Sequence, residues 1–361
     1  MATTFKSFVN DDIAKSTTLL HESIPVTGTL VSGTYTDSVK TYSHGMFKTV
    51  FDYPYLSSSA NNLFDLTVGH SVNSIYVNTA DTFNTKKTNI YNEYAQLLAG
   101  YDSDGDICEF EASGNFTDPS SALLMRDFYA LNFSRLLYKD EIKKGTVSVI
   151  LGVRDDHDDP FFSGTSDLAY ITDKNGYTNY RTNSPAGEFG LLYVTGSKYS
   201  TDTDRECGFV FYQAGVVLLT SSIFMNVAGD GFIDTGYCPC SMSADTTDSV
   251  LGYFTTRSIE SNCDAFLHRV YNISFNNTTE LNSTIYFCRL RSNEFNYSSN
   301  PTYISGSKMV VKNISRDAPV SYITTVGLYS AQNELLAVAK LSEPLKKDPT
   351  TELNLRVRLD Y

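Results

Sequence analysis

Apolar and polar residues alternate one by one near the end of the chain, which is the pattern of half-buried strands. Three stretches show it most clearly, at residues 322–329, 335–341 and 353–361. A short polar turn at residues 331–333 joins the first two. We expect the three stretches to form a three-stranded antiparallel meander, with the chain ending inside its last strand.

The stretch at residues 335–341 is apolar on both of its predicted faces. Strict alternation puts one set of side chains on one side and a second set on the other: Leu335, Ala337, Ala339 and Leu341, and then Leu336, Val338 and Lys340. Because each face is partly apolar, we expect another domain or another subunit to cover both. Pro344 and Pro349 bracket a predicted loop that contains Lys346 and Lys347.

Two segments in the first half have the apolar spacing of three and four residues that is typical of helices. The first covers residues 85–99 and stops at Gly100, and the second covers residues 118–138, with Asp118 as its cap. After Gly145 the pattern changes to strands, beginning at residues 147–151. The apolar run at residues 209–224 predicts one or two buried strands, and residues 173–176 and 182–187 predict hairpin turns.

These patterns predict a mainly β fold with a minor helical part, of the α+β class, built from antiparallel, sandwich-like sheets. The change of pattern divides the chain into residues 1–145, an N-terminal arm with a mixed region and two helices, and residues 146–361, an all-β domain. A single unit is the alternative. Residues 1–40 are rich in Ser and Thr and contain a strand-like piece at residues 24–35. They predict either an arm that wraps a neighbouring subunit or an ordinary first strand.

The composition favours strands and large surfaces that are partly exposed to solvent. The chain has 25 Tyr, 22 Phe and no Trp, and only 19% of its residues are charged, below the roughly 25% that is usual. Tyr and Phe favour strands, and Tyr favours protein interfaces. The net charge of −13 argues against direct binding to nucleic acid, which is itself a polyanion.

No export signal or membrane span is expected from the pattern of apolar residues. The first ten residues lack a basic region followed by an apolar one, and no window approaches 18 unbroken apolar residues. We therefore expect a protein made in a cytoplasm, with its six cysteines free of disulfides at synthesis.

The sequence nominates no catalytic, cofactor-binding or metal-binding residue. It contains no G-x-S-x-G nucleophile elbow and no phosphate-binding glycine loop. The five histidines, His21, His44, His70, His157 and His268, stand in no catalytic pattern, and His268 is expected to be a satisfied core residue.

Two acidic clusters and one set of cysteines offer weak metal patterns. Asp102, Asp104 and Asp106 begin like a calcium loop, but Ile107 and Ser113 stand where an EF-hand needs Gly and Glu. The second cluster, Asp155, Asp156, Asp158 and Asp159, reads as a solvated loop. Cys238, Cys240, Cys263 and Cys288 could supply four thiolates to zinc, although their spacing lacks the usual C-x2-C pairs, and buried free cysteines are the commoner reading.

Three stretches of sequence resemble virion structural proteins of marine T4-like tailed phages, including those of cyanophages. The first runs from His44-Gly-Met-Phe47 through Tyr53-Pro-Tyr-Leu-Ser-Ser-Ser-Ala60 to Asn62-Leu-Phe-Asp-Leu-Thr-Val-Gly69. The second is Glu294-Phe-Asn-Tyr-Ser-Ser-Asn-Pro-Thr-Tyr303, and the third covers residues 321–347. The third is the most specific, because its strand, polar turn and Glu-Leu-Leu-Ala-Val-Ala-Lys return resemble a pattern of tail and baseplate proteins.

The resemblance implies a non-enzymatic structural subunit of a virion that contacts other subunits and copies of itself. It implies no catalytic residue, and it favours the tail or baseplate over the neck and the capsid exterior. A receptor- or glycan-binding module is the alternative, with Tyr177, Tyr180, Tyr297 and Tyr303 as residues that could stack on sugars. A tail-borne hydrolase would need two facing carboxylates, which sequence alone does not reveal.

Overall fold

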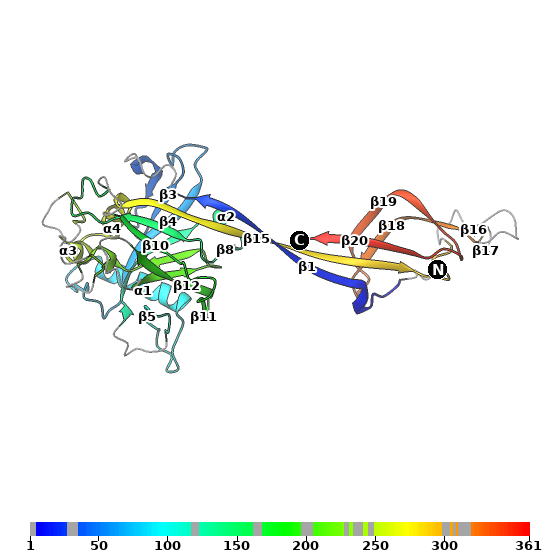
Figure 1. Ribbon diagram of the computed structural model, residues 1–361, viewed down its shortest axis with the longest axis horizontal. Coiled ribbons are helices and arrows are strands. Elements are labelled where there is room, and N and C mark those ends of the chain that lie inside the picture. The colour runs from blue at the N-terminus through cyan, green and yellow to red at the C-terminus, as the bar shows by residue number, and fades with distance from the viewer. Residues whose placement is uncertain are drawn as a thin grey trace. The chain divides into compact units, whose positions relative to one another are not determined.

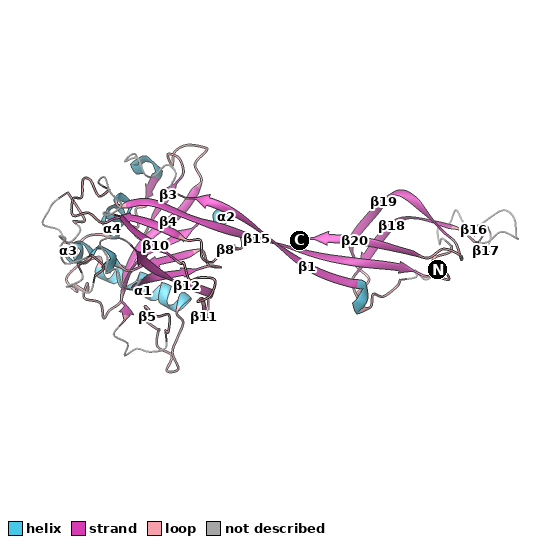
Figure 2. Ribbon diagram, viewed as in Figure 1, coloured by secondary structure: helices cyan, strands magenta, loops and turns pink. Residues whose placement is uncertain are grey.

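The computed structural model confirms the mainly β fold with a minor helical part, as the strands of Figure 2 show. The residues that it describes are 5–26, 35–116, 123–161, 168–195, 205–226, 231–233, 241–244, 249–297, 304–305, 308–309 and 319–361. None of the helices in this described part is both long and apolar enough to cross a membrane.

The chain divides into two compact units, and the division does not fall near residue 145 as the sequence predicted. Unit 1 consists of Met1–Leu19 and Glu280–Tyr361, and unit 2 consists of Leu20–Thr279. The ends of the chain therefore belong to one unit, and the middle forms the other. The expected boundary was wrong because the strands before and after residue 145 belong to the same sheet of unit 2.

Unit 2 is built on a long antiparallel sheet in the order β15-β9-β10-β12-β13-β14-β7-β4-β3-β2. Its strands are β2 (Val39–Thr41), β3 (Lys48–Phe51), β4 (Asn62–His70), β7 (Asp127–Phe133), β9 (Ser148–Gly152), β10 (Leu168–Thr172), β12 (Gly187–Thr195), β13 (Arg205–Phe211), β14 (Val216–Leu219) and the first half of β15 (Val270–Leu290). Smaller strands are β5 (Phe110–Glu111), β6 (Leu124–Met125), β8 (Glu141–Ile142) and β11 (Arg181–Ser184).

The central strands of this sheet are buried on both faces. All four residues of β14 are buried, as are six of the seven residues of β7. The helix α1 (Asn84–Leu98) packs closely on β4, because a Cβ on Gly69 would lie 2.9 Å from the backbone nitrogen of Tyr91. The hydrophobic core of the protein therefore lies in unit 2.

The structure confirms the first predicted helix and corrects the second. Helix α1 matches the expectation for residues 85–99. Residues 118–138 do not form one helix: β6 and β7 occupy most of the part that is described, followed by the single turn α2 (Arg135–Tyr138), and Asp118 lies outside the described residues. The prediction failed because a strand buried on both faces carries a continuous apolar run, which periodicity cannot distinguish from a buried helix.

Two helices after residue 145 were missed. These are α3 (Val250–Thr256) and α4 (Ile259–His268). Each begins at a serine whose hydroxyl accepts a backbone hydrogen bond, Ser249 from the nitrogen of Gly252 and Ser258 from the nitrogen of Ser261. Serine is a preferred N-cap, so the two serines were the signal in the sequence. The predicted strands at residues 147–151 and 209–224 are confirmed as β9, β13 and β14. The chain turns at residues 173–176, but this is not a hairpin turn, because the strands that flank it, β10 and β11, do not pair with each other. The second predicted turn is part of a hairpin between β11 and β12, although its residues 182–184 lie in β11.

Unit 1 contains a strand group and a separate hairpin (Figure 1). The second half of β15 pairs with β20 (Leu353–Asp360), from Ser283 opposite Asp360 to Leu290 opposite Leu353. The hairpin consists of β18 (Ser321–Tyr329) and β19 (Leu335–Lys347). The expected meander is therefore wrong in its third strand, because β20 pairs with β15 and not with β19. Short strands β16 (Ile304–Ser305) and β17 (Lys308–Met309) pair with each other.

Strand β19 continues through the segment predicted as a loop. Lys346 and Lys347 pair with Tyr322 and Ser321, while Pro344 falls at a register shift between Ile323 and Thr325. A bulge leaves a residue without a ladder partner, so proline is tolerated there. The N-terminal strand β1 (Ile13–Pro25) pairs with β15 and lies upstream of the predicted piece at residues 24–35, of which residues 27–34 lie outside the described part. The described residues also contain the 3-10 turns η1 (Asn10–Asp12), η3 (Tyr35–Ser38) and η5 (Ser221–Phe224).

Candidate interaction surface

Unit 1 lacks an apolar core among the residues that the structure describes. Only Val320, Leu328 and Val357 are buried apolar side chains there, and none belongs to the core cluster of unit 2. All but one of the positions in the burial pattern of β19 are half-buried or exposed. An isolated two-stranded hairpin is marginally stable in water, so we expect a partner to bury the exposed apolar residues of this unit.

Hydrogen bonds replace apolar packing inside unit 1. Lys347 is fully buried, and its Nζ donates to the carbonyl oxygen of Ser292 at 3.2 Å and to Oδ1 of Asn296 at 2.7 Å. The Ser283 hydroxyl donates to the carboxylate of Asp360 at 2.5 Å, across the β15–β20 pair. These bonds fix the geometry of the unit, while its apolar side chains remain available on the surface.

Large apolar side chains gather at the turn end of the β18–β19 hairpin. We call Tyr329, Leu335, Leu336 and Val338 the hairpin strip; they are 46%, 53%, 69% and 50% exposed. A Cβ on Gly327 would lie 2.9 Å from the Tyr329 ring and 3.3 Å from Cδ1 of Leu335. The glycine therefore leaves room for both side chains to lie over it.

A register shift brings three members of the hairpin strip together, Tyr329, Leu335 and Val338. Val338 pairs with Gly327, and Leu335 pairs with Tyr329 across a shift that follows Leu328. Strict alternation had put Leu335 and Val338 on opposite faces, but both lie next to Gly327. Bulges re-aim side chains in this way, and here the result is a larger apolar surface on one side of the hairpin.

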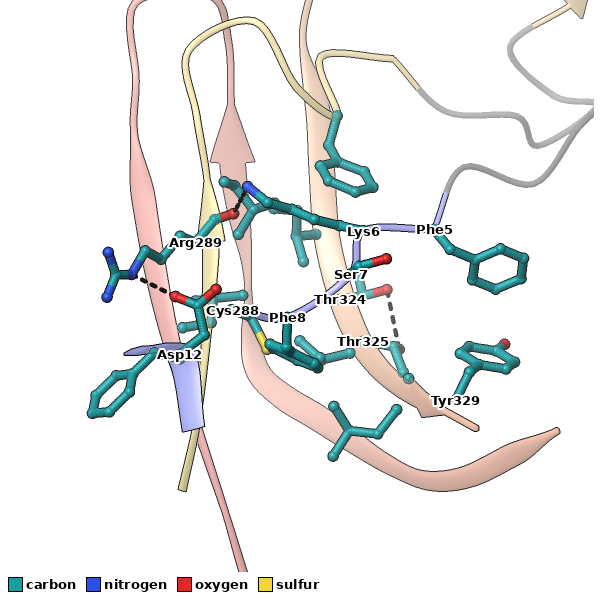
Figure 3. Close-up of a pocket in the computed structure, with 18 of the residues that line it drawn as sticks. Phe5, Lys6, Ser7, Phe8, Asp12, Cys288, Arg289, Thr324, Thr325 and Tyr329 are labelled. Atoms are coloured by element: carbon teal, nitrogen blue, oxygen red, sulfur yellow. Dashed lines mark hydrogen bonds and ion pairs between the residues drawn. The ribbon is translucent and has the colours of Figure 1, made fainter. Parts of the chain in front are cut away.

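A groove with a volume of about 650 Å³ lies beside the hairpin (Figure 3). Its walls come from β18, from β15 around Cys288, and from residues 5–8 of an N-terminal segment, residues 5–9, that we call the strap. Tyr297, one of the proposed sugar-stacking residues, also lines it. The groove has a mixed apolar and polar lining, as expected for a surface that receives protein.

Three side chains of the strap contact residues in and around the groove. The ring of Phe5 meets that of Tyr329 edge-on with centroids 5.0 Å apart, and the ring of Phe8 lies 5.4 Å from that of Tyr286. The Nζ of Lys6 forms an ion pair with Glu294 at 2.6 Å. The Ser/Thr-rich N-terminus predicts an arm, but these residues were missed; their signal is two phenylalanines around a lysine within that stretch.

In unit 2, the buried carboxylates of Asp127 and Asp173 form hydrogen bonds that hold turns in place. Burial raises the pKa of Asp127, which accepts hydrogen bonds from the backbone nitrogen and hydroxyl of Ser221. Burial also raises the pKa of Asp173, although three donors oppose this shift: the backbone nitrogens of Gly145 at 2.7 Å and Val147 at 2.8 Å, and the Tyr212 hydroxyl at 3.1 Å. Both carboxylates tie segments of the chain together.

Of the four cysteines considered as a zinc site, Cys263 and Cys288 lie in the described residues. Cys263 is buried in α4, where its thiol donates to the carbonyl oxygen of Leu66, and it belongs to unit 2. Cys288 belongs to unit 1, and Cys238 and Cys240 lie outside the described part. No group of three or more potential ligands from His, Cys, Asp and Glu occurs in the part that was described.

The acidic clusters form local loop contacts. Asp102 accepts hydrogen bonds from the backbone nitrogens of Asp104 and Asp106. In the second cluster, Asp159 pairs with Arg154 at 3.2 Å. His268 is half-buried and satisfied, since its Nε2 lies 2.7 Å from the carbonyl oxygen of His157 and the two rings stack.

Comparisons with protein-family models, with curated proteins and with solved structures give no match to this chain. The resemblance to phage virion proteins therefore stays a prediction from the sequence.

Proposed function

We propose that this protein is a structural subunit of a tailed-phage virion, which assembles through unit 1 with copies of itself and with other subunits of the tail or baseplate. One observation carries the proposal: among its described residues, unit 1 exposes the hairpin strip but buries almost no apolar side chain of its own. Scattered surface leucines are ordinary in a monomer, whereas a contiguous apolar surface on a unit without a core is typical of an interface.

The proposal that the particle is a tailed-phage virion rests on the resemblance seen in the sequence. The stretch at residues 321–347, which resembles tail and baseplate proteins, is the β18–β19 hairpin that carries the strip. The most specific part of the resemblance and the most exposed apolar surface of unit 1 therefore coincide. This coincidence supports an assembly role over a role for unit 2 alone.

We predict that a Leu335→Glu/Val338→Glu double variant loses self-association. Each side chain is about half exposed, so both substitutions leave the fold intact in the free chain. At an interface, each would remove about 1.5 kcal/mol or more of apolar burial and introduce a charge that must be desolvated. The dissociation constant, measured by sedimentation velocity over a range of concentrations, should rise at least about 100-fold.

The matched control is Leu56→Glu/Leu136→Glu, which adds the same charge at two exposed leucines of unit 2, 86% and 78% exposed. It should associate like the unmodified protein. A double variant of the hairpin strip that associates as tightly as this control would contradict the proposal. So would an unmodified protein that sediments as a monomer at every concentration.

A second candidate function, glycan binding, has one observation in its favour. Tyr177 and Tyr180 are both exposed beside the turn at Lys144 and Gly145. Exposed aromatic rings next to a charged side chain are a common sugar-binding arrangement. However, the Nζ of Lys144 already lies 4.2 Å from the centre of the Tyr180 ring, and Tyr177 packs where a Cβ of residue 145 would lie. Both rings are therefore already in contact with neighbouring residues of the same chain, which favours the assembly role over sugar binding.

A further inference from the structure

We propose that the strap is exchanged between copies, so that residues 5–9 of one copy seat in the groove of a second copy. This inference rests on the proposed self-association through the hairpin strip, and it adds the strap as a second part of the same interface. Reciprocal exchange of an identical segment is a low-cost route to an oligomer.

The residues that bind the strap lie far from it in the sequence. Lys6 reaches the carbonyl oxygen of Arg289 at 2.6 Å and the carboxylate of Glu294, which are 283 and 288 residues further along the chain. Every wall other than the strap and Asp12 comes from residues 287–355. A second copy therefore presents the same groove and the same partners to an incoming strap.

Releasing the strap disrupts little of the structure. Residues 5–9 belong to no helix or strand, and the Lys6 side chain forms the hydrogen bonds to the groove. Val9 bonds only locally, because its backbone nitrogen donates to the carboxylate of Asp12 and its carbonyl oxygen accepts from the backbone nitrogen of Asp12. The ion pair between Lys6 and Glu294 is about one-third exposed on each side, and exposed pairs of this kind contribute little to stability. By contrast, Asp12 is buried and pairs with Arg289 at 2.8 Å, so the chain is anchored just after the strap.

The strap's present seat leaves its apolar residues half covered. Phe5, Phe8 and Val9 are all exposed beyond one-third of their surface, and the groove beside them is unfilled. Phe5 also contacts Tyr329, a member of the hairpin strip. The strap is thus continuous with the surface proposed to meet a second copy, and a neighbour's strap would extend the same interface while its Lys6 meets Glu294.

Cross-linking between two differently substituted chains tests the exchange. Phe8 and Cys288 line the same groove (Figure 3). One chain carries Phe8→Cys with Cys288→Ser, and the other keeps Phe8 and Cys288. The two are mixed, treated with a short bismaleimide, and the linked peptides are identified by mass spectrometry. A link between position 8 and Cys288 can then form only between copies.

We expect this link in the mixed sample, and we expect its yield to fall several-fold when Lys6→Glu is added to the first chain. Glu294→Lys in the second chain should restore the yield, because the ion pair is re-formed with its charges reversed. A control chain with Leu136→Cys and Cys288→Ser places the new thiol on unit 2 and should give no link to Cys288.

The outcomes separate this inference from the proposed function. If the chains associate in sedimentation but the link forms only within a single chain carrying Phe8→Cys and an intact Cys288, the exchange is overturned and the assembly role stands. If the chains do not associate at all, both are overturned. A yield of the link that stays the same when Lys6→Glu is added would also overturn the proposed position of the strap in the groove.

Discussion

Replacing Arg269 by Met should lower the free energy of unfolding of unit 2 by about 3 kcal/mol or more. Arg269 is fully buried at the junction of α4 and β15. Its guanidinium donates to the carbonyl oxygens of Gly152 at 3.1 Å and Arg154 at 2.9 Å, and to that of Ser241. Methionine keeps the apolar stem but supplies no donor, and each carbonyl left without one costs about 1–3 kcal/mol.

Chemical denaturation followed by tyrosine circular dichroism measures this effect. Arg154→Met is the matched control, because Arg154 is the partly exposed arginine that pairs with Asp159 in the neighbouring loop. Exposed ion pairs are worth about 1 kcal/mol or less, so the control should stay close to the unmodified protein. A loss below 1 kcal/mol for Arg269→Met would show that the three carbonyls find other donors.

The contribution of Lys87 to the stability of unit 2 should rise with pH from about 8 towards 10, so the unmodified protein should gain stability relative to the Lys87→Met variant over this range. Lys87 is fully buried on α1, and its Nζ donates to the carbonyl oxygen of Phe254 at 2.6 Å, near the end of α3. Burial lowers the pKa of Lys87 to about 8 from its ordinary 10.5, although the charge of Asp81 opposes the shift.

The sign follows from proton binding. Between the two pKa values the unfolded chain holds a proton on Lys87 that the folded chain has released, so unfolding takes up a proton and becomes harder as pH rises. The slope approaches about 1.4 kcal/mol per pH unit for one proton. Cysteine and tyrosine ionisation acts in both proteins, so the difference between their two stability curves isolates Lys87.

Lys86→Met is the control for that measurement, since Lys86 is the exposed neighbour on the same helix. Its curve should run parallel to that of the unmodified protein. Parallel curves for Lys87→Met as well would contradict the account of Lys87 as a buried cation that bonds the end of α3.

The sequence predicted what depends on local pattern. Helix α1, strands β9, β13 and β14, and the hairpin of β18 and β19 all follow from periodicity and turn residues. Strand β7 was misread because burial on both faces removes the alternation. The two units could not be predicted, because the pairing of β15 with β20 joins residues more than 60 positions apart, and local pattern carries no information about such partners.

Only part of the candidate interaction surface could be predicted from the sequence. That both faces of residues 335–341 carry apolar side chains can be read from alternation, and the structure leaves Leu335 and Leu336 exposed. The register shift that gathers Leu335 with Val338 cannot be read there, because a bulge depends on the partner strand. The contacts of Lys6 with Arg289 and Glu294 span nearly the whole chain, so the strap's seat also required the structure.

A cryo-electron microscopy map of the intact virion, with this chain traced in it, tests the central claim most directly. The account predicts a position in the tail or baseplate in which another subunit covers Tyr329, Leu335, Leu336 and Val338. A chain at an exposed tip, with this hairpin strip open to solvent and no neighbour against unit 1, would contradict it.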